Sequence, residues 1–180
     1  MYIYIKILAK KLIMSTIAKN INQQEKPNHL YRCGVAIMLI NKQKKIFVGK
    51  RIDNQSDSWQ MPQGGIDVGE DEDVAMFREL REETGIADNF VKILKKSDNY
   101  FYYDLPYKLQ KKFWGGKYLG QKQRWYLLEF IGEDSDIDIF SHEPEFCEWK
   151  WVDKINLIEL IVNFKRELYQ QIVNEFNDFL

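Results

Sequence analysis

The run of 22 residues from Gly64 to Gly85 constrains this chain more than any other part of its sequence. It reads GGIDVGEDEDVAMFRELREETG and begins with glycines, which favour a tight turn. Glu79, Glu82 and Glu83 follow at spacings of three and four residues, which places them on one face of a helix. The run therefore predicts a glycine-rich turn that leads into a helix with a carboxylate face.

The same helix has an apolar side and recognisable ends. Val74, Phe77, Leu80 and Thr84 lie opposite the glutamates, so we expect this side to be buried. Acidic residues crowd the start of the helix, where the helix dipole favours negative charge. Gly85 stands where a left-handed C-terminal cap is needed.

The three glutamates allow two interpretations. Neighbouring carboxylates on a helix face lie about 5–6 Å apart and repel one another. A hard divalent cation with oxygen ligands, such as Mg²⁺ or Mn²⁺, would turn that repulsion into binding. A solvated acidic face fits as well, because like-charge pairs there cost only about 0.2–0.5 kcal/mol each. Taken alone, the glutamates favour the solvated face.

The flanking residues change this interpretation. With Ile86 the run fits the pattern G-x5-E-x7-R-E-U-x-E-E-x-G-U at every position, where U is an apolar residue. At average residue usage, a chance match in a chain of this length arises roughly once in a million. The chain therefore resembles the Nudix hydrolases. The resemblance implies hydrolysis of a nucleoside diphosphate linked to a further group. It also implies an α/β fold, an α/β/α sandwich whose mixed sheet is flanked by the motif helix and a long C-terminal helix.

The resemblance also implies roles for the motif residues. Glu79, Glu82 and Glu83 are the implied metal ligands, together with the backbone carbonyl of Gly64. Arg78 is implied to orient a glutamate by ion pairing, and Glu82 is well placed four residues further on. Hydrolysis of a phosphoanhydride needs a neutralised phosphate chain and an activated water, which Mg²⁺ or Mn²⁺ and a nearby glutamate can provide. Which glutamate acts as the base is left open.

Four segments outside the motif narrow the resemblance: WQMPQGG, GQKQRW, PEF with the tryptophan that follows it, and VNFKRELY. They are similar to segments of the bacterial branch of RNA pyrophosphohydrolases and dinucleoside polyphosphate hydrolases. That branch implies removal of pyrophosphate or phosphate from the 5′ end of triphosphorylated or diphosphorylated RNA, which initiates mRNA decay. The alternative substrates are dinucleoside polyphosphates such as diadenosine tetraphosphate. A non-catalytic RNA-binding regulator is a third hypothesis, but we would expect it to have lost some of the metal glutamates.

The branch implies further site residues. Glu145, in Pro144-Glu145-Phe146, matches an additional metal-binding or catalytic glutamate, although it also fits an ordinary acid in an acidic loop. The positions that match contacts to phosphate, RNA backbone or other parts of the substrate are Arg32, Arg51, Ser58, Tyr103 and Lys165. The positions that match the pocket for the first base are Val162 and Phe164. Phe164 also belongs to the apolar stripe of the last predicted helix, so base stacking and core packing both remain open.

Charge is segregated along the chain, although the net charge is only −1. From Lys108 to Arg124 there are six basic residues and no acidic ones, and from Trp125 to Trp149 there are eight acidic residues and no Lys or Arg. Such asymmetry is compatible with a polyanionic substrate between a basic wall and an acidic, metal-binding pocket. In the basic stretch the cations are mixed with aromatic residues, which suits single-stranded RNA. A solvated loop with some buried aromatics fits it equally well.

The remaining sequence predicts one domain over residues 31–180. Strands are predicted at residues 31–40, 45–51, 90–94, 97–104, 123–131 and 146–152. Apolar residues that step by three or four from Ile161 to Phe179 predict the long amphipathic C-terminal helix. Residues 1–30 are predicted to be an N-terminal extension that is flexible or dispensable.

The cellular setting is predicted from the first residues and the cysteines. The first fourteen residues, MYIYIKILAKKLIM, are too short to span a membrane and make a poor signal peptide, and a true start at Met14 would remove most of them. Cys33 and Cys147 make neither a disulfide framework nor a zinc site. We therefore expect a cytoplasmic protein with reduced thiols, no membrane association and no obligate protein partner.

Overall fold

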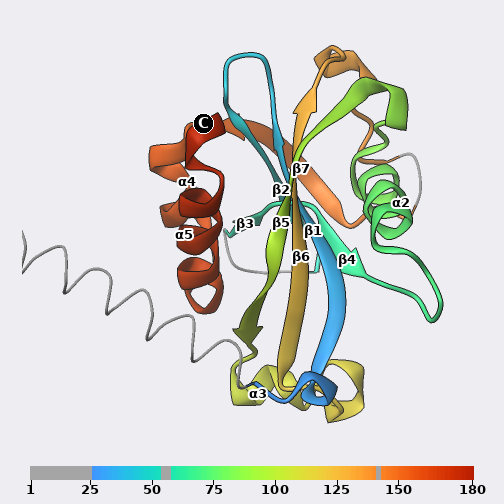
Figure 1. The fold of residues 1–180 in the computed structure, drawn as a ribbon, viewed down its shortest axis with the longest axis vertical. Helices are drawn as coiled ribbons and strands as arrows, with labels where there is room; N and C mark the ends of the chain where they lie inside the picture. The colour runs from blue at the N-terminus through green and yellow to red at the C-terminus, as the bar shows by residue number, and fades with distance from the viewer. Residues whose placement is uncertain (1–25, 54–57, 141–142) are drawn as a thin grey trace, which may run out of the picture.

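The structure is a computed structural model that describes residues 26–53, 58–140 and 143–180. A seven-stranded mixed sheet carries helices on both faces, which confirms the predicted α/β/α arrangement (Figure 1). Most of the predicted N-terminal extension lies outside the described residues; Asn28–Leu30 form a 3-10 turn, η1, before the first strand. Among the described helices, none has the length and apolar character needed to cross a membrane.

The sheet is organised around its first strand. β1 (Tyr31–Ile40) runs parallel to β6 (Gly120–Phe130) along its whole length, and the other pairs of strands are antiparallel. The strand order is β3-β2-β1-β6-β5, with β4 paired to β1 and β7 paired to β2. The remaining strands are β2 (Ile46–Arg51), β3 (Trp59–Gln60), β4 (Gln63–Gly65), β5 (Val91–Asp104) and β7 (Phe146–Val152).

The predicted strands are confirmed, with one change of continuity. The two segments predicted at residues 90–94 and 97–104 form a single strand, β5. Its pairing with β6 shifts register between Ile93 and Lys95 and again between Lys96 and Tyr100, which is where the predicted break fell. Bulges of this kind interrupt the alternation of buried side chains without ending the strand, so the sequence pattern looked like two strands.

The motif helix, α2 (Glu72–Thr84), covers one face of the sheet (Figure 1). Its start is capped by Asp71, whose side chain accepts a hydrogen bond from the backbone N–H of Asp73. Its end is the predicted left-handed cap, because Gly85 has a φ of 70°. The local signals in the sequence were sufficient to predict this helix.

The buried side of α2 differs from the prediction. Val74 is 59% exposed and Phe77 is only half-buried. Glu79 and Glu83 are instead turned toward β4 and buried. The buried face of α2 is therefore rotated about the helix axis relative to the predicted apolar face. The other buried residues of α2 are Ala75, Met76, Leu80 and Thr84.

Shorter helices, rather than one long helix, cover the other face of the sheet (Figure 1). Ile161 is extended, with a ψ of 143°, and forms an isolated β-bridge with Trp59, so a helix cannot continue through it. The predicted apolar stripe persists, since Leu168, Ile172 and Phe176 are all buried. The segments are α4 (Lys154–Leu160), the 3-10 turn η5 (Asn163–Lys165), α5 (Arg166–Glu175) and the 3-10 turn η6 (Asn177–Phe179).

Two apolar cores lie on opposite faces of the sheet. Trp125 and Tyr169 belong to the core beneath α5, whereas Met76 and Phe146 belong to the core beneath α2. Successive strand residues point to opposite faces, so the central strands supply both cores. The connections add α3 (Tyr107–Gln110) and the 3-10 turns η2 (Asp88–Phe90), η3 (Trp114–Gly116) and η4 (Asp134–Asp136).

Candidate active site

The candidate catalytic residues gather where β4 meets α2. Gly64 lies so close to the helix that a Cβ atom at this position would overlap the Glu79 carboxylate. Glycine is therefore needed here for close approach of the backbone. The structure thus brings two of the predicted metal ligands together, and it buries the Glu79 side chain against the strand.

Arg78 holds the carboxylates of this region in place. Its Nε and Nη2 atoms each lie 2.8 Å from a different oxygen of Glu70, and Nη2 also donates to the carbonyl oxygen of Gly65 at 2.8 Å. Its Nη1 atom is shared by Glu79 at 2.8 Å and Glu82 at 3.0 Å. The predicted pair with Glu82 is therefore present, as one part of a wider network. The hydrogen bond from Arg78 is the main reason that the pKa of Glu70 is lowered to about 2.

Glu83 is the most buried of the three predicted glutamates, with only 1% of its surface exposed. Its Oε2 atom accepts a hydrogen bond of 2.8 Å from the backbone N–H of Gln63. Its Oε1 atom is buried and has no hydrogen-bond partner among the described residues. Burial, and then the negative charge of Glu145, raise the pKa of Glu83 well above its ordinary value. The nearby charge of Arg51 only partly offsets this rise, and one buried oxygen of the carboxylate stays without a hydrogen bond from the described residues.

Glu145 reaches the same region from a distant part of the sequence. The pairing of β2 with β7 brings it beside Arg51, whose Nη1 atom lies 2.6 Å from Glu145 Oε2. Arg51 also binds Asp53, with 2.7 Å between Nε and Oδ1. The negative charge of Glu145 contributes to the raised pKa of both Glu83 and Glu79, so Glu145 lies close to the motif carboxylates.

The acidic residues are held by arginines rather than gathered around one point. No three His, Cys, Asp or Glu side chains among the described residues are already arranged to hold a metal ion. Arg78 takes up one oxygen each of Glu79 and Glu82, and Arg51 takes up one of Glu145. A cation at this site would have to compete with these two guanidinium groups for the carboxylate oxygens.

A buried lysine lies on the other side of Gln63. Lys165 is 5% exposed, and its Nζ atom is 3.1 Å from Gln63 Oε1 and 3.4 Å from Gln60 Oε1. Burial, and then the charge of Arg51, lower its pKa to about 7. Since Gln63 donates its backbone N–H to Glu83, one residue links the motif glutamates to this cation.

The two predicted base-binding positions lie next to the lysine. The rings of Phe164 and Tyr103 are 6.0 Å apart between centroids, and Lys165 Nζ is 5.0 Å from the centroid of Tyr103. Val162 and Phe164 are half-buried at the edge of the core beneath α5. Phe164 thus packs against the core and still keeps part of its ring accessible.

The other predicted contacts fall on separate elements. The guanidinium of Arg32 lies against Gly65, because a Cβ atom there would overlap it. Ser58 is half-buried directly before β3. The structure therefore brings Arg32 to the motif loop.

Two polar residues of the site were not predicted. Gln63 Oε1 accepts hydrogen bonds from both Gln123 Nε2 and Lys165 Nζ, each at 3.1 Å. Gln123 is fully buried and Gln63 is half-buried, and a buried amide is costly unless it is hydrogen-bonded, so this pair indicates a role at the site. The segments WQMPQGG and GQKQRW contain both residues, but the sequence alone gave no partner for either side chain.

Comparison with known proteins identifies similar sequences over most of the chain. A family model for the NUDIX domain matches residues 30–172. The RNA pyrophosphohydrolase of Sphingopyxis alaskensis is 52% identical over 146 residues, which cover 81% of this chain and 92% of that protein. The RNA pyrophosphohydrolase of Novosphingobium aromaticivorans is 52% identical over 152 residues, which cover 83% of this chain and 94% of that protein.

Solved structures share the fold at much lower identity. The dihydroneopterin triphosphate pyrophosphohydrolase of E. coli has a TM-score of 0.64 and 19% identity, with 81% of this chain and 98% of that chain covered. A C. elegans Ap4A hydrolase has a TM-score of 0.58 and 18% identity, with 81% and 99% covered. At these identities the likeness concerns the fold alone.

Proposed function

The chain belongs to the Nudix family, and from that premise we propose that it hydrolyses phosphoanhydride bonds at the 5′ end of triphosphorylated or diphosphorylated RNA. Two relatives that are about half identical over more than 80% of the chain are RNA pyrophosphohydrolases. In the cell this reaction would initiate mRNA decay. The enzyme would act in the cytoplasm, as a single domain over residues 31–180.

The observation that carries the proposal is the buried Glu83 carboxylate, whose Oε1 atom has no hydrogen-bond partner among the described residues. A buried carboxylate oxygen without a hydrogen bond is costly, and two further glutamates raise the local negative charge. A divalent cation with oxygen ligands fits this set of donors. A solvated acidic face does not explain why Glu79 and Glu83 are buried.

Glu79, Glu82, Glu83 and Glu145 would hold Mg²⁺ or Mn²⁺, together with the backbone carbonyl of Gly64. When bound, the cation supplies positive charge that stabilises the phosphate chain and lowers the pKa of the attacking water. Arg78 orients the glutamates through its fork of hydrogen bonds. Any of these glutamates that is free of the cation can accept the proton of the water.

The cations that flank the cluster would bind the substrate. Arg51 pairs with Glu145, and Lys165 shares Gln63 with Glu83, which supports a role for both cations in binding phosphates held at the cluster. Arg32 would contact phosphate or RNA backbone from the motif loop, and Ser58 would contact the substrate from the start of β3. Val162 and Phe164 would hold the first base, and Tyr103 would contact the substrate beside Phe164.

The substrate class is tested by one side-by-side assay. Purified protein is given a 5′-triphosphate RNA or diadenosine tetraphosphate, with Mg²⁺ or Mn²⁺ in turn. We expect the higher kcat/KM with RNA. Efficient cleavage of the dinucleotide with untouched RNA would instead establish a dinucleoside polyphosphate hydrolase. Tight binding of RNA without hydrolysis of either substrate would point to the non-catalytic regulator.

A further inference from the structure

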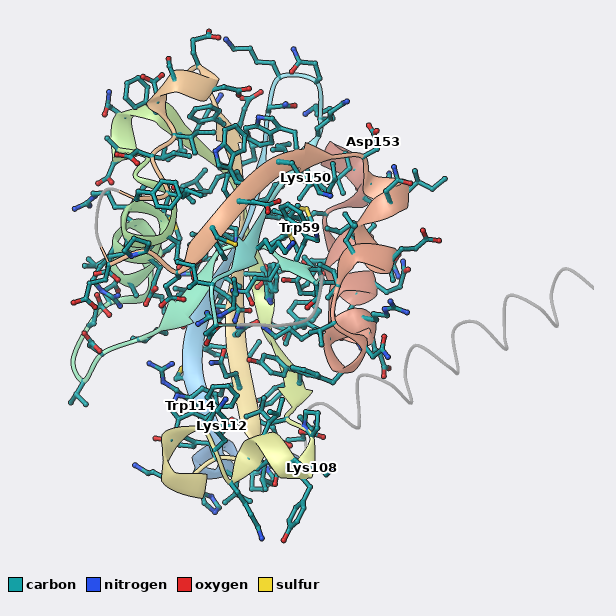
Figure 2. The ribbon with its side chains drawn as sticks, turned by 180° about the vertical axis from the view of Figure 1, so that it is seen from behind. Trp59, Lys108, Lys112, Trp114, Lys150 and Asp153 are labelled. Carbon is teal, nitrogen blue, oxygen red and sulfur yellow. The ribbon has the colours of Figure 1, made fainter. Side chains whose placement is uncertain are left out.

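We propose that residues Tyr107–Tyr118, here called the basic segment, bind the RNA chain downstream of its 5′ end, with Trp114 as a stacking surface for a base. The inference rests on the proposed function and extends it to nucleotides beyond those at the cluster. The basic segment connects β5 to β6 through α3 and η3. Figure 2 shows Lys108, Lys112 and Trp114 together on this connection, at one end of the sheet.

The lysines of the basic segment are not paired with acidic side chains in the described part of the chain. The segment contains four lysines and no acidic residue: Lys108, Lys111, Lys112 and Lys117. None of them forms an ion pair within the described part of the chain. Clustered cations of this kind attract a phosphate backbone, and binding then releases the counterions of the nucleic acid.

The lysines are combined with aromatic rings. Lys111 Nζ lies 4.9 Å from the centroid of Tyr107, and Lys117 Nζ lies 5.1 Å from that of Tyr118. Tyr107 is 70% exposed, far more than a ring that serves the core. Exposed rings next to cations are what single-stranded nucleic acid requires, since bases stack on the rings while phosphates meet the charges.

Trp114 has an unusual backbone for so large a residue. Its φ is 50°, in the left-handed region, and Gly115 and Gly116 continue that conformation. Bulky residues rarely adopt it, and such outliers concentrate at functional sites. The indole is held by neighbouring rings, with centroid distances of 5.8 Å to Phe113 and 6.0 Å to Tyr118. The ring remains half-buried, so part of it is accessible.

One contact and one electrostatic interaction connect the basic segment to the candidate active site. The guanidinium carbon of Arg32 lies 5.5 Å from the centroid of Trp114, while the same guanidinium rests against Gly65 of the motif loop. On another side, the pKa of Asp53 is lowered mainly by its hydrogen bond with Arg51 and further by the charge of Lys112. An RNA with its 5′ phosphates at the glutamates would therefore meet Arg32 first and the basic segment next.

The test compares RNAs of different length. Wild type and the triple variant Lys108→Gln, Lys111→Gln, Lys117→Gln are given 5′-triphosphate RNAs of two or ten nucleotides. Lys112 is left intact because it faces the Arg51–Asp53 pair. For wild type we expect a lower KM with the longer RNA. In the triple variant the ratio of the KM for the short RNA to the KM for the long RNA should fall by about tenfold or more, because roughly three phosphate contacts are lost. The slope of log K against log salt concentration should become shallower by about 2.

The controls separate this inference from a general effect of charge. The variant Lys44→Gln, Lys45→Gln, Lys92→Gln removes the same charge from exposed positions elsewhere and should keep the length advantage. Trp114→Ala should lose stacking, read as a loss of affinity for the ten-nucleotide RNA that exceeds its loss of affinity for the two-nucleotide RNA. An unchanged length advantage in both the lysine and the tryptophan variants would overturn the inference.

Its failure is distinguishable from a failure of the proposed function. If wild type hydrolyses no 5′-triphosphate RNA of either length, the proposed function is wrong. The basic segment is still tested by the binding of a fluorescent ten-nucleotide RNA that carries a 5′ hydroxyl. Weaker binding by the lysine variant than by its control supports the inference, and equal binding contradicts it.

Discussion

Arg78 and Glu83 are charged residues of the same helix, but they differ in how completely their polar atoms are hydrogen-bonded. Arg78 is satisfied by three glutamates and a carbonyl oxygen, whereas Glu83 keeps a buried oxygen without a partner. A protein selected only for stability would have no reason to keep the second arrangement, because a buried polar oxygen without a hydrogen bond is destabilising. At the scale of single residues, the site is recognised by a buried carboxylate oxygen that has no hydrogen-bond partner within the described part of the chain.

Gly64→Ala tests the close contact between β4 and Glu79. We expect the added methyl group to displace the Glu79 carboxylate, so that hydrolysis falls strongly and more metal is needed for half-maximal activity. Gly69→Ala is the matched control in the same loop: it has a φ of 83° but no atom within 4 Å of the added Cβ. Gly69→Ala should lower the free energy of unfolding, and it should change the metal concentration needed for half-maximal activity less than Gly64→Ala does. Equal metal titrations for the two variants would contradict this account.

Lys165→Met tests the buried lysine through the pH dependence of stability. Burial lowers the pKa of Lys165 from 10.5 to about 7, so between these values the unfolded chain binds a proton that the folded chain does not. The cost of burying this lysine is greatest below about pH 7 and disappears as the pH rises toward 10.5.

The variant should therefore be more stable than wild type at pH 6.5, and this difference should shrink by pH 9.5. Urea unfolding in metal-free buffer at both pH values measures the difference directly. A difference that does not change with pH would show that Lys165 is not buried as a titrating group.

At the scale of elements, the decisive unit is the pair formed by the β4 loop and α2. Arg78 connects them, since it binds Glu70 and Gly65 before the helix proper and Glu79 and Glu82 on the helix. The bidentate contact with Glu70 uses the planar fork of the guanidinium, which a lysine cannot reproduce.

Arg78→Lys should loosen this connection without melting α2. We expect a folded protein with reduced activity and with a free energy of unfolding lower by about 1–3 kcal/mol, as for lost hydrogen bonds to charged groups. Arg81→Lys is the control, because Arg81 lies on the same helix but pairs with exposed Asp88 at 3.1 Å. Activity and unfolding are measured for both. Equal effects of the two substitutions would contradict the role given to Arg78.

The elements also show what the sequence could and could not predict. The motif helix was predictable because its cap, its glutamates and Gly85 are all local signals. The face that α2 buries was predicted wrongly, because the positions of Glu79 and Glu83 depend on docking to β4. The break at Ile161 was missed for the same reason: it is caused by pairing with Trp59, which is distant in the sequence.

At the scale of the whole molecule, one sheet brings together groups that are far apart in the chain. The pairing of β2 with β7 carries Glu145 to Arg51, and the turn before α5 carries Lys165 to Gln63. The sequence predicted both residues only through resemblance to a family, because spacing alone cannot reveal contacts between distant segments. The contact of Arg32 with Trp114 had no signal of either kind.

The domain boundary gives a prediction at this scale. The family match begins at residue 30, and the described contacts of the site use no residue before Arg32. A chain that starts at Lys26 should therefore keep the kcat/KM of the full chain. A chain that starts at Gly34 should lose stability, because Tyr31 Oη donates a 2.6 Å hydrogen bond to Asp104 and would be removed together with Arg32. Loss of activity in the first truncation would refute the single domain over residues 31–180.

The central claim is that the α2 glutamates perform metal-dependent hydrolysis of an RNA 5′ phosphate chain. It is tested most directly by the single-turnover rate of phosphate or pyrophosphate release from 5′-triphosphate RNA by Glu82→Gln. Glu167→Gln, the same change at an exposed position of α5, is the control. We predict that Glu82→Gln lowers the rate by roughly 10²-fold or more while RNA is still bound, and that the control is unchanged. A wild-type rate in Glu82→Gln would contradict the claim.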